Sequence, residues 1–175
     1  MPAPLRYVII LVIKDELLMK KKIYIETSIP SFYFETRTDP EMIARRNWTR
    51  EWWDNCSDRF ELVTSEPVLD ELDEGDYPNK KDVIHFLDNV LLLTVEEEIA
   101  AIVSAYITNK AMPKDPTGDA LHLALASYHK CDFLLTWNCN HLANANKFGH
   151  IQSVNAMLGL FTPNLVTPYQ LLGGK

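Results

Sequence analysis

Apolar and polar residues follow two patterns along the chain, one typical of buried strands and one typical of amphipathic helices. Short apolar runs predict five strands, at residues 22–26, 60–65, 90–95, 132–138 and near 165–168. Segments with the helical period lie between them, at residues 39–56, 67–74, 80–89, 96–112, 116–131 and 141–160. Strands that alternate with helices in this way predict the α/β class, with a parallel sheet covered by helices on both faces.

Residues at two helix boundaries agree with this pattern. Asp39 and Pro40 form an N-cap followed by proline in the first turn, and Gly75 stops the helix that Pro67 opens. In a parallel sheet of this class, ligands gather at the carboxyl ends of the strands, near the point where the strand order reverses. Residues that directly follow a strand are therefore the first candidates for a functional site.

The first eighteen residues stand apart from this alternation. Their apolar run, "LRYVIILVI", ends at Lys14, which is too short to span a bilayer, and no cleavage site of small residues follows. Our hypothesis is that translation starts at Met19, so that residues 1–18 are a non-native or flexible extension and residues 19–175 form a single domain. The alternative is an additional edge strand, "RYVIILVI".

Composition and net charge limit the classes of protein to which the chain can belong. A chain of 175 residues that is 47% hydrophobic and has only six glycines suits a globular domain with a real core. Its three cysteines, in no paired spacing, predict free thiols in a reducing cytoplasm. A net charge of −7 excludes non-specific coating of nucleic acid, so a polyanionic substrate would need bound cations or a local basic patch. The lysines available for such a patch are Lys20, Lys21, Lys22, Lys80 and Lys81.

Acidic residues lie at the end of a predicted strand and on predicted helices, at positions from which they could form a site at the carboxyl ends of the strands. Glu26 ends the first strand, where the chain passes into a helix. On the helix after the second strand, the helical period leaves Glu71 or Asp73 beside the buried face and turns Asp70 and Glu74 away. Asp119 begins an almost wholly apolar helix, so its charge needs a partner.

Each acid also has a plain structural explanation. Glu26 and the acidic helix could be solvated surface, and Asp119 could serve the helix dipole in a first turn capped by Thr117 or Asp115. Three carboxylates at one sheet edge, however, repel one another unless they are protonated, spread apart or neutralised by a cation. All-oxygen clusters of this kind suit Mg²⁺ or Mn²⁺.

Four blocks of the sequence resemble, in order and spacing, those of the PIN domain family, in particular bacterial VapC-like toxins. The blocks are "YIETSIPSFYF", "SEPVLDEL", "GDALHLALA" and "FLLTWNCNHLANA". The resemblance implies a three-layer α/β/α sandwich with a central parallel sheet, and an acidic pocket that binds Mg²⁺ or Mn²⁺ and hydrolyses RNA. Carried over to this chain, the family's site positions fall on Glu26, Glu71, Asp119, Thr136 and Asn138, with Thr27 and Ser28 as the small hydroxyl residues after the first acid.

Two positions depart from the family pattern. Glu26 replaces an aspartate and is longer by one methylene, and Asn138 replaces an acid and removes one charge. An amide oxygen can still ligate a metal or hold a metal-bound water, but affinity for a second cation should fall. The metal ligands implied are Glu26, Glu71 and Asp119, with Asp115 and Asn138 as further candidates.

The predicted function is that of a metal-dependent endoribonuclease, the toxin component of a type II toxin–antitoxin pair, acting on RNA and partnered by a small antitoxin. One alternative is a catalytically weakened PIN-like module that binds RNA or protein. A second alternative is a structure-specific DNA nuclease, although the chain shows no additional DNA-clamping element.

Aromatic residues and histidines allow two further interpretations. Trp48, Trp52 and Trp53 recur at helical spacing, which is typical of buried core; the alternative is an exposed patch that binds a second copy, an antitoxin or stacked bases. The aromatic content of this helix is the basis for predicting a homodimer. His122 and His141 lack the spacing of a zinc site and are predicted to be structural or surface residues.

Overall fold

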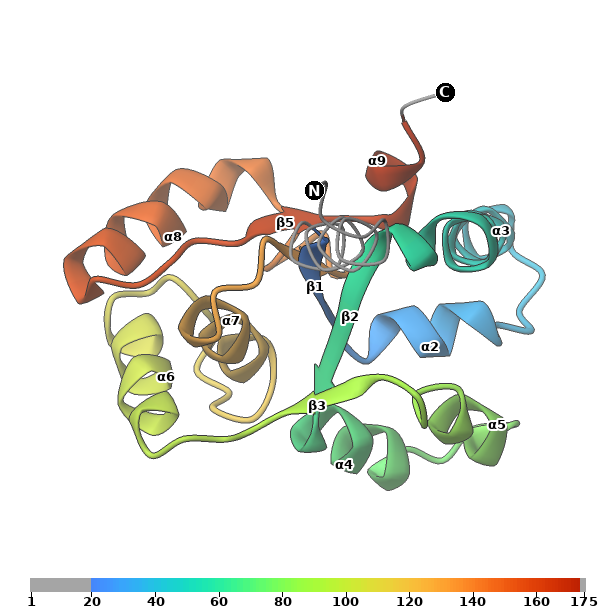
Figure 1. Ribbon diagram of the computed structural model, residues 1–175, viewed down its shortest axis with the longest axis horizontal. Helices are drawn as coiled ribbons and strands as arrows, with labels where there is room; N and C mark the ends of the chain where they lie inside the picture. The colour runs from blue at the N-terminus through green and yellow to red at the C-terminus, as the bar shows by residue number, and fades with distance from the viewer. Residues whose placement is uncertain (1–19, 174–175) are drawn as a thin grey trace, which may run out of the picture.

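The computed structural model describes residues 20–173, in which five parallel strands form one sheet with the order β3-β2-β1-β4-β5 (Figure 1). The strands are β1 (Lys21–Ile25), β2 (Phe60–Ser65), β3 (Leu91–Leu93), β4 (Phe133–Leu135) and β5 (Asn164–Val166). Helices cover both faces, so the predicted α/β class and three-layer architecture are confirmed. The predicted start at Met19 and the segment before it lie outside the described residues.

The helices form two layers. The α-helices are α2 (Ser28–Tyr33), α3 (Pro40–Cys56), α4 (Glu66–Glu74), α5 (Lys80–His85), α6 (Glu98–Thr108), α7 (Asp119–Tyr128), α8 (Ala145–Leu158) and α9 (Pro168–Leu172). In one layer α6 packs against α7 and α8, and in the other α2 and α9 pack against α3, on the opposite side of the sheet in Figure 1. Among residues 20–173, no helix has the length and hydrophobicity that a membrane span requires.

Strand β1 is the centre of the sheet and of the core. Ile23, Tyr24 and Ile25 are fully buried because β2 and β4 flank the strand and helices cover both faces. The strand order reverses between β1 and β4, since β2 and β3 continue to one side and β4 and β5 to the other. Residues after β1 and β4 therefore meet at the switch point, where folds of this class bind ligands.

Several elements differ in length from their predicted ranges. Strand β4 ends at Leu135 because the next hydroxyl, that of Thr136, accepts a hydrogen bond from the backbone N–H of Asn138 (2.8 Å) and turns the chain. Helix α6 ends at Thr108, before a turn in which Lys110 takes a positive φ of 58°. Helix α9 was not predicted, although Thr167 and Gln170 form a capping box at its start.

The tryptophans of α3 pack against other residues of the same chain. Trp52 is fully buried, Trp53 contacts Phe86 at 4.1 Å between ring centroids, and Trp48 packs against Trp137 and Tyr169. The core interpretation is therefore confirmed for Trp52, whereas Trp48 and Trp53 are partly buried against the core, and the predicted homodimer gains no support from these contacts. The three cysteines are free, as predicted.

Candidate functional site

Glu26 is a buried carboxylate at the switch point. It directly follows β1, is only 4% exposed, and accepts hydrogen bonds from the Ser28 hydroxyl and from the Ser28 backbone N–H (3.0 Å). The same Ser28 hydroxyl accepts a bond from the backbone N–H of Trp137 (2.8 Å), which ties the carboxyl end of β1 to that of β4. Burial raises the pKa of Glu26, because the ionised form loses hydration that these hydrogen bonds replace only in part.

Glu71 reaches the same place from α4. The Thr27 hydroxyl lies 3.1 Å from an oxygen of Glu26 and 3.2 Å from an oxygen of Glu71, so one hydroxyl faces both carboxylates. The second oxygen of Glu71 lies 3.1 Å from Nε2 of His122 on α7. This hydrogen bond from His122 lowers the pKa of Glu71. The structure thus selects Glu71 over Asp73, whose carboxylate instead pairs with Lys80 at 3.2 Å.

Asp119 pairs with Asn138. Both oxygens of Asp119, the first residue of α7, lie 2.8 Å from Nδ2 of Asn138 in the loop after β4. Burial raises the pKa of Asp119, and the hydrogen bond from Asn138 partly opposes this effect. The charges of His141, His122 and Glu71 also act on this pKa.

The amide of Asn138 has a fixed orientation. Its oxygen accepts hydrogen bonds from the backbone N–H groups of Asn140 (3.2 Å) and His141 (3.1 Å), so the nitrogen must face Asp119. The oxygen that was expected to ligate a metal or hold a water is therefore engaged by the loop. Thr136 is fully buried, and its hydroxyl shapes this loop while a hydrogen bond from its side chain lowers the pKa of Glu26.

Asp115 and Thr117 contact each other in the turn before α7, at the margin of the site. Asp115 is exposed and accepts hydrogen bonds from the backbone N–H (2.9 Å) and hydroxyl (2.8 Å) of Thr117, in the turn before α7. These bonds lower its pKa. Neither Asp115 nor Thr117 caps α7, whose N-cap is Gly118 without a side-chain hydrogen bond, so the predicted cap is wrong.

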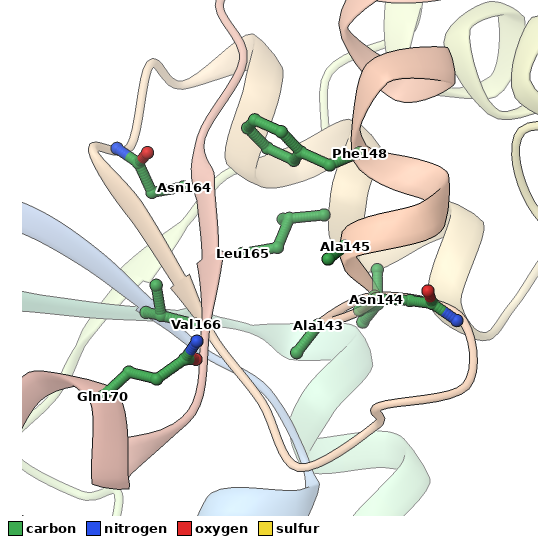
Figure 2. Close-up of a pocket in the computed structure, with 9 residues that line it drawn as sticks. Ala143, Asn144, Ala145, Phe148, Asn164, Leu165, Val166 and Gln170 are labelled. Carbon is green, nitrogen blue, oxygen red and sulfur yellow. The ribbon is translucent and has the colours of Figure 1, made fainter.

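The lysines proposed as a basic patch are not at the site. Residues 20–22 lie at the amino end of β1, at the sheet edge opposite Glu26, and Lys80 pairs with Asp73. A groove of about 460 Å³ beside Glu71 is instead lined by the acidic side chains of Asp70, Glu71, Glu74 and Asp115. A second pocket, of about 310 Å³, lies between α8 and β5 and contains no carboxylate; Figure 2 shows Phe148 and Leu165 between these elements.

The described residues contain no group of three or more His, Cys, Asp or Glu side chains gathered closely enough to hold a metal ion. No protein-family model matches the chain, and no curated protein matches it either. The likeness to PIN domains therefore depends on the four sequence blocks alone.

His122 is the site residue whose role the sequence analysis missed. It is 2% exposed, neither a surface residue nor an isolated core histidine, because its two ring nitrogens face Tyr24 and Glu71. A signal was present: His122 lies three residues after Asp119 on the same helix, so both side chains lie near one face of α7.

Proposed function

We propose that the chain is a metal-dependent endoribonuclease that hydrolyses RNA phosphodiester bonds, the toxin component of a type II toxin–antitoxin pair. The observation that supports this function best is the buried carboxylate of Glu26 at the switch point, sharing the Thr27 hydroxyl with Glu71. Burying a carboxylate costs free energy, which hydrogen bonds from Thr27 and Ser28 offset only in part. Its position is explained if a positive group binds beside it.

The donor atoms at this edge are those that Mg²⁺ or Mn²⁺ prefers. Glu26, Glu71 and Asp119 offer carboxylate oxygens, and no lysine or arginine among residues 20–173 forms an ion pair with them. We propose these three as the metal ligands, with Asp115 and Asn138 at the margin. When bound, the cation supplies an activated water and neutralises charge on the phosphoryl oxygens.

The chain's own residues hold these donors in place. The Ser28 hydroxyl and backbone N–H orient Glu26, and the Thr27 hydroxyl spaces Glu26 from Glu71. Asn138 holds both oxygens of Asp119, so this carboxylate must exchange an amide hydrogen bond for a cation. Thr136 fixes the loop that carries Asn138.

Replacing Asp119 by asparagine tests the proposal. We expect cleavage of a mixed RNA pool to fall by orders of magnitude, because the metal loses a ligand. The melting temperature without metal should stay level or rise, since burial already disfavours the charge of Asp119. The increase in melting temperature on adding Mn²⁺ should shrink.

Asp73→Asn is the matched control, because Asp73 belongs to the acidic helix but pairs with Lys80 away from the site. It should keep both cleavage and the response to Mn²⁺. If Asp119 served only the helix dipole, Asp119→Asn would instead lose about 0.3–1 kcal/mol of stability and cleave like wild type. That pattern would remove Asp119 from the site.

A non-catalytic PIN-like module that binds RNA or protein is the second candidate. Two observations favour it: the amide of Asn138 occupies both oxygens of Asp119, and no three metal-binding side chains are gathered among residues 20–173. This module would bind Mn²⁺ weakly and cleave nothing. Adding single-stranded and branched DNA to the cleavage panel separates the third candidate, a structure-specific DNA nuclease.

Two partners belong to the proposal. A toxin requires an antitoxin, so we expect a short neighbouring gene that encodes a basic or amphipathic protein. We also propose that the chain forms a homodimer, which now depends on exposed apolar residues of strand β3 rather than on the tryptophans of α3.

A further inference from the structure

A line of buried polar side chains lies behind Glu71. Tyr24 on β1 and Ser65 at the end of β2 are fully buried, and His122 on α7 is 2% exposed. The Tyr24 hydroxyl lies 2.6 Å from the Ser65 hydroxyl and 3.1 Å from Nδ1 of His122. Nε2 of His122 lies 3.1 Å from Glu71, so three elements of the core connect to a carboxylate on a fourth.

The hydrogen bond between His122 and Glu71 can have only one direction. A carboxylate only accepts hydrogen bonds, so Nε2 of His122 must carry the hydrogen that faces Glu71. The Tyr24 hydroxyl holds the opposite side of the imidazole, and Ser65 holds Tyr24. The ring is therefore locked by groups that do not themselves reach the site.

We infer that His122 is a positioning residue that, locked by Tyr24 and Ser65, fixes the Glu71 carboxylate in the orientation needed to bind a divalent cation. This inference rests on the proposed function. Glu71 has a side chain that is 50% exposed, so without restraint it would sample several rotamers. With one oxygen held by His122 and the other by the Thr27 hydroxyl, its carboxylate is preorganised.

A second buried tyrosine shows what a purely structural network looks like. Tyr106 is fully buried, and its hydroxyl oxygen lies 2.6 Å from Oδ1 of Asn155 and 3.1 Å from the Ser127 hydroxyl, both of which are buried. That network closes within the core. The network of Tyr24 ends instead on the half-exposed carboxylate of Glu71, at the switch point. Hydrogen bonds that orient a metal ligand from outside the coordination sphere are expected at such a place.

The first test measures Mn²⁺ affinity by calorimetry without RNA. His122→Asn keeps a polar group near Tyr24 but loses the donor at the Nε2 position, and we expect affinity to fall about 10–100-fold. His122→Gln places an amide nitrogen close to the Nε2 position and should restore much of the affinity. Tyr24→Phe should weaken binding as well, whereas Tyr106→Phe, which also removes one buried hydroxyl, should leave it unchanged.

Equal affinity in wild type and His122→Asn, or equal losses in Tyr24→Phe and Tyr106→Phe, would overturn the inference. A second measurement separates it from the proposed function. In the metal-free protein, the ¹³C signal of the Glu71 carboxylate should shift in His122→Asn and Tyr24→Phe but not in Tyr106→Phe. If wild type neither binds Mn²⁺ nor cleaves RNA, the proposed function fails; an unshifted Glu71 signal then overturns the positioning role too, and a shifted one supports it.

Discussion

Asn138 joins the loop after β4 to the carboxylate of Asp119. Its amide oxygen accepts from two backbone N–H groups of the loop while its nitrogen donates to Asp119. An aspartate at this position could satisfy the loop equally well with one oxygen. Its other oxygen would then lie against Asp119, where two negative charges repel and one pKa must rise.

Replacing Asn138 by aspartate should therefore separate stability from metal binding. Without metal, we expect unfolding free energy to fall by about 1–3 kcal/mol, because a buried hydrogen bond becomes a repulsive contact. With saturating Mn²⁺ the variant should recover this loss and hold or raise its RNA cleavage, since the cation gains a carboxylate ligand. Urea unfolding with and without Mn²⁺ measures both effects.

Asn140→Asp is the control for added charge, because Asn140 is exposed and only its backbone supports the loop. It should change neither the metal-free stability nor the response to Mn²⁺. A metal-free Asn138→Asp protein as stable as wild type would contradict the geometry described for Asp119.

At the scale of elements, α8 contains one glycine and is followed by another, and the two have opposite roles. Gly149 lies exposed within the helix, and a Cβ added there would meet no atom within 4 Å. Gly159 follows the helix with a φ of 68°, and the N–H groups of Gly159 and Leu160 close the helix end on Ala156 and Asn155. Only the second position needs the left-handed backbone that glycine tolerates.

Alanine at each position should move stability in opposite directions. Gly149→Ala should raise the unfolding free energy by about 0.5–1 kcal/mol, because alanine loses less backbone entropy in a helix. Gly159→Ala should lower it by about 1–2 kcal/mol through strain in the left-handed region. Paired denaturant curves check the signs, and a stabilised Gly159→Ala would show that α8 ends differently.

All five strands were predictable from sequence, because each is a short apolar run bounded by polar or turn residues. The buried face of helix α4 was predictable, but its apolar period put both Glu71 and Asp73 beside that face, and only the structure separates them. Helix α9 was missed because five residues carry little periodicity and its position depends on packing against α3. Its capping box, Thr167 with Gln170, was the one local signal.

The site was only partly predictable for a different reason. Glu26 was predictable because it ends a strand, whereas Thr136 and Asn138 came only from the resemblance to the family's sequence blocks. The hydrogen bonds of His122 depend on the order of strands, which brings Tyr24 and Ser65 beneath α7 from distant parts of the chain. The direction in which Asn138 turns its amide depends on the loop backbone, which no residue pattern encodes.

At the scale of the whole molecule, two of the exposed apolar residues, Leu91 and Leu92, lie on a strand at the edge of the sheet. Among residues 20–173, strand β3 pairs only with β2, and Leu91 and Leu92 are 59% and 48% exposed. An edge strand with exposed leucine side chains favours association with another chain. We expect light scattering at micromolar concentration to give about twice the monomer mass of 20.1 kDa.

Leu92→Lys should convert this dimer to monomer, while Met157→Lys, at a 63% exposed position on α8, should leave it intact. Both side chains are exposed, so neither variant should unfold the protein. A monomer mass for wild type across the micromolar range would remove the homodimer from the proposal.

The central place of β1 also has a consequence for the timing of synthesis. The ribosome makes β1 before β4, so one edge of β1 has no partner strand until β4 has been made. The backbone N–H of Lys22, for example, donates a hydrogen bond to the carboxylate of Asp132, which lies 110 residues later in the sequence. At about 5–20 residues per second, Glu26 and Glu71 leave the ribosome several seconds before Asp119 and Asn138. An RNA-cleaving activity built on these residues would be absent from the nascent chain until the ribosome had passed the codon of Asn138 on its own messenger.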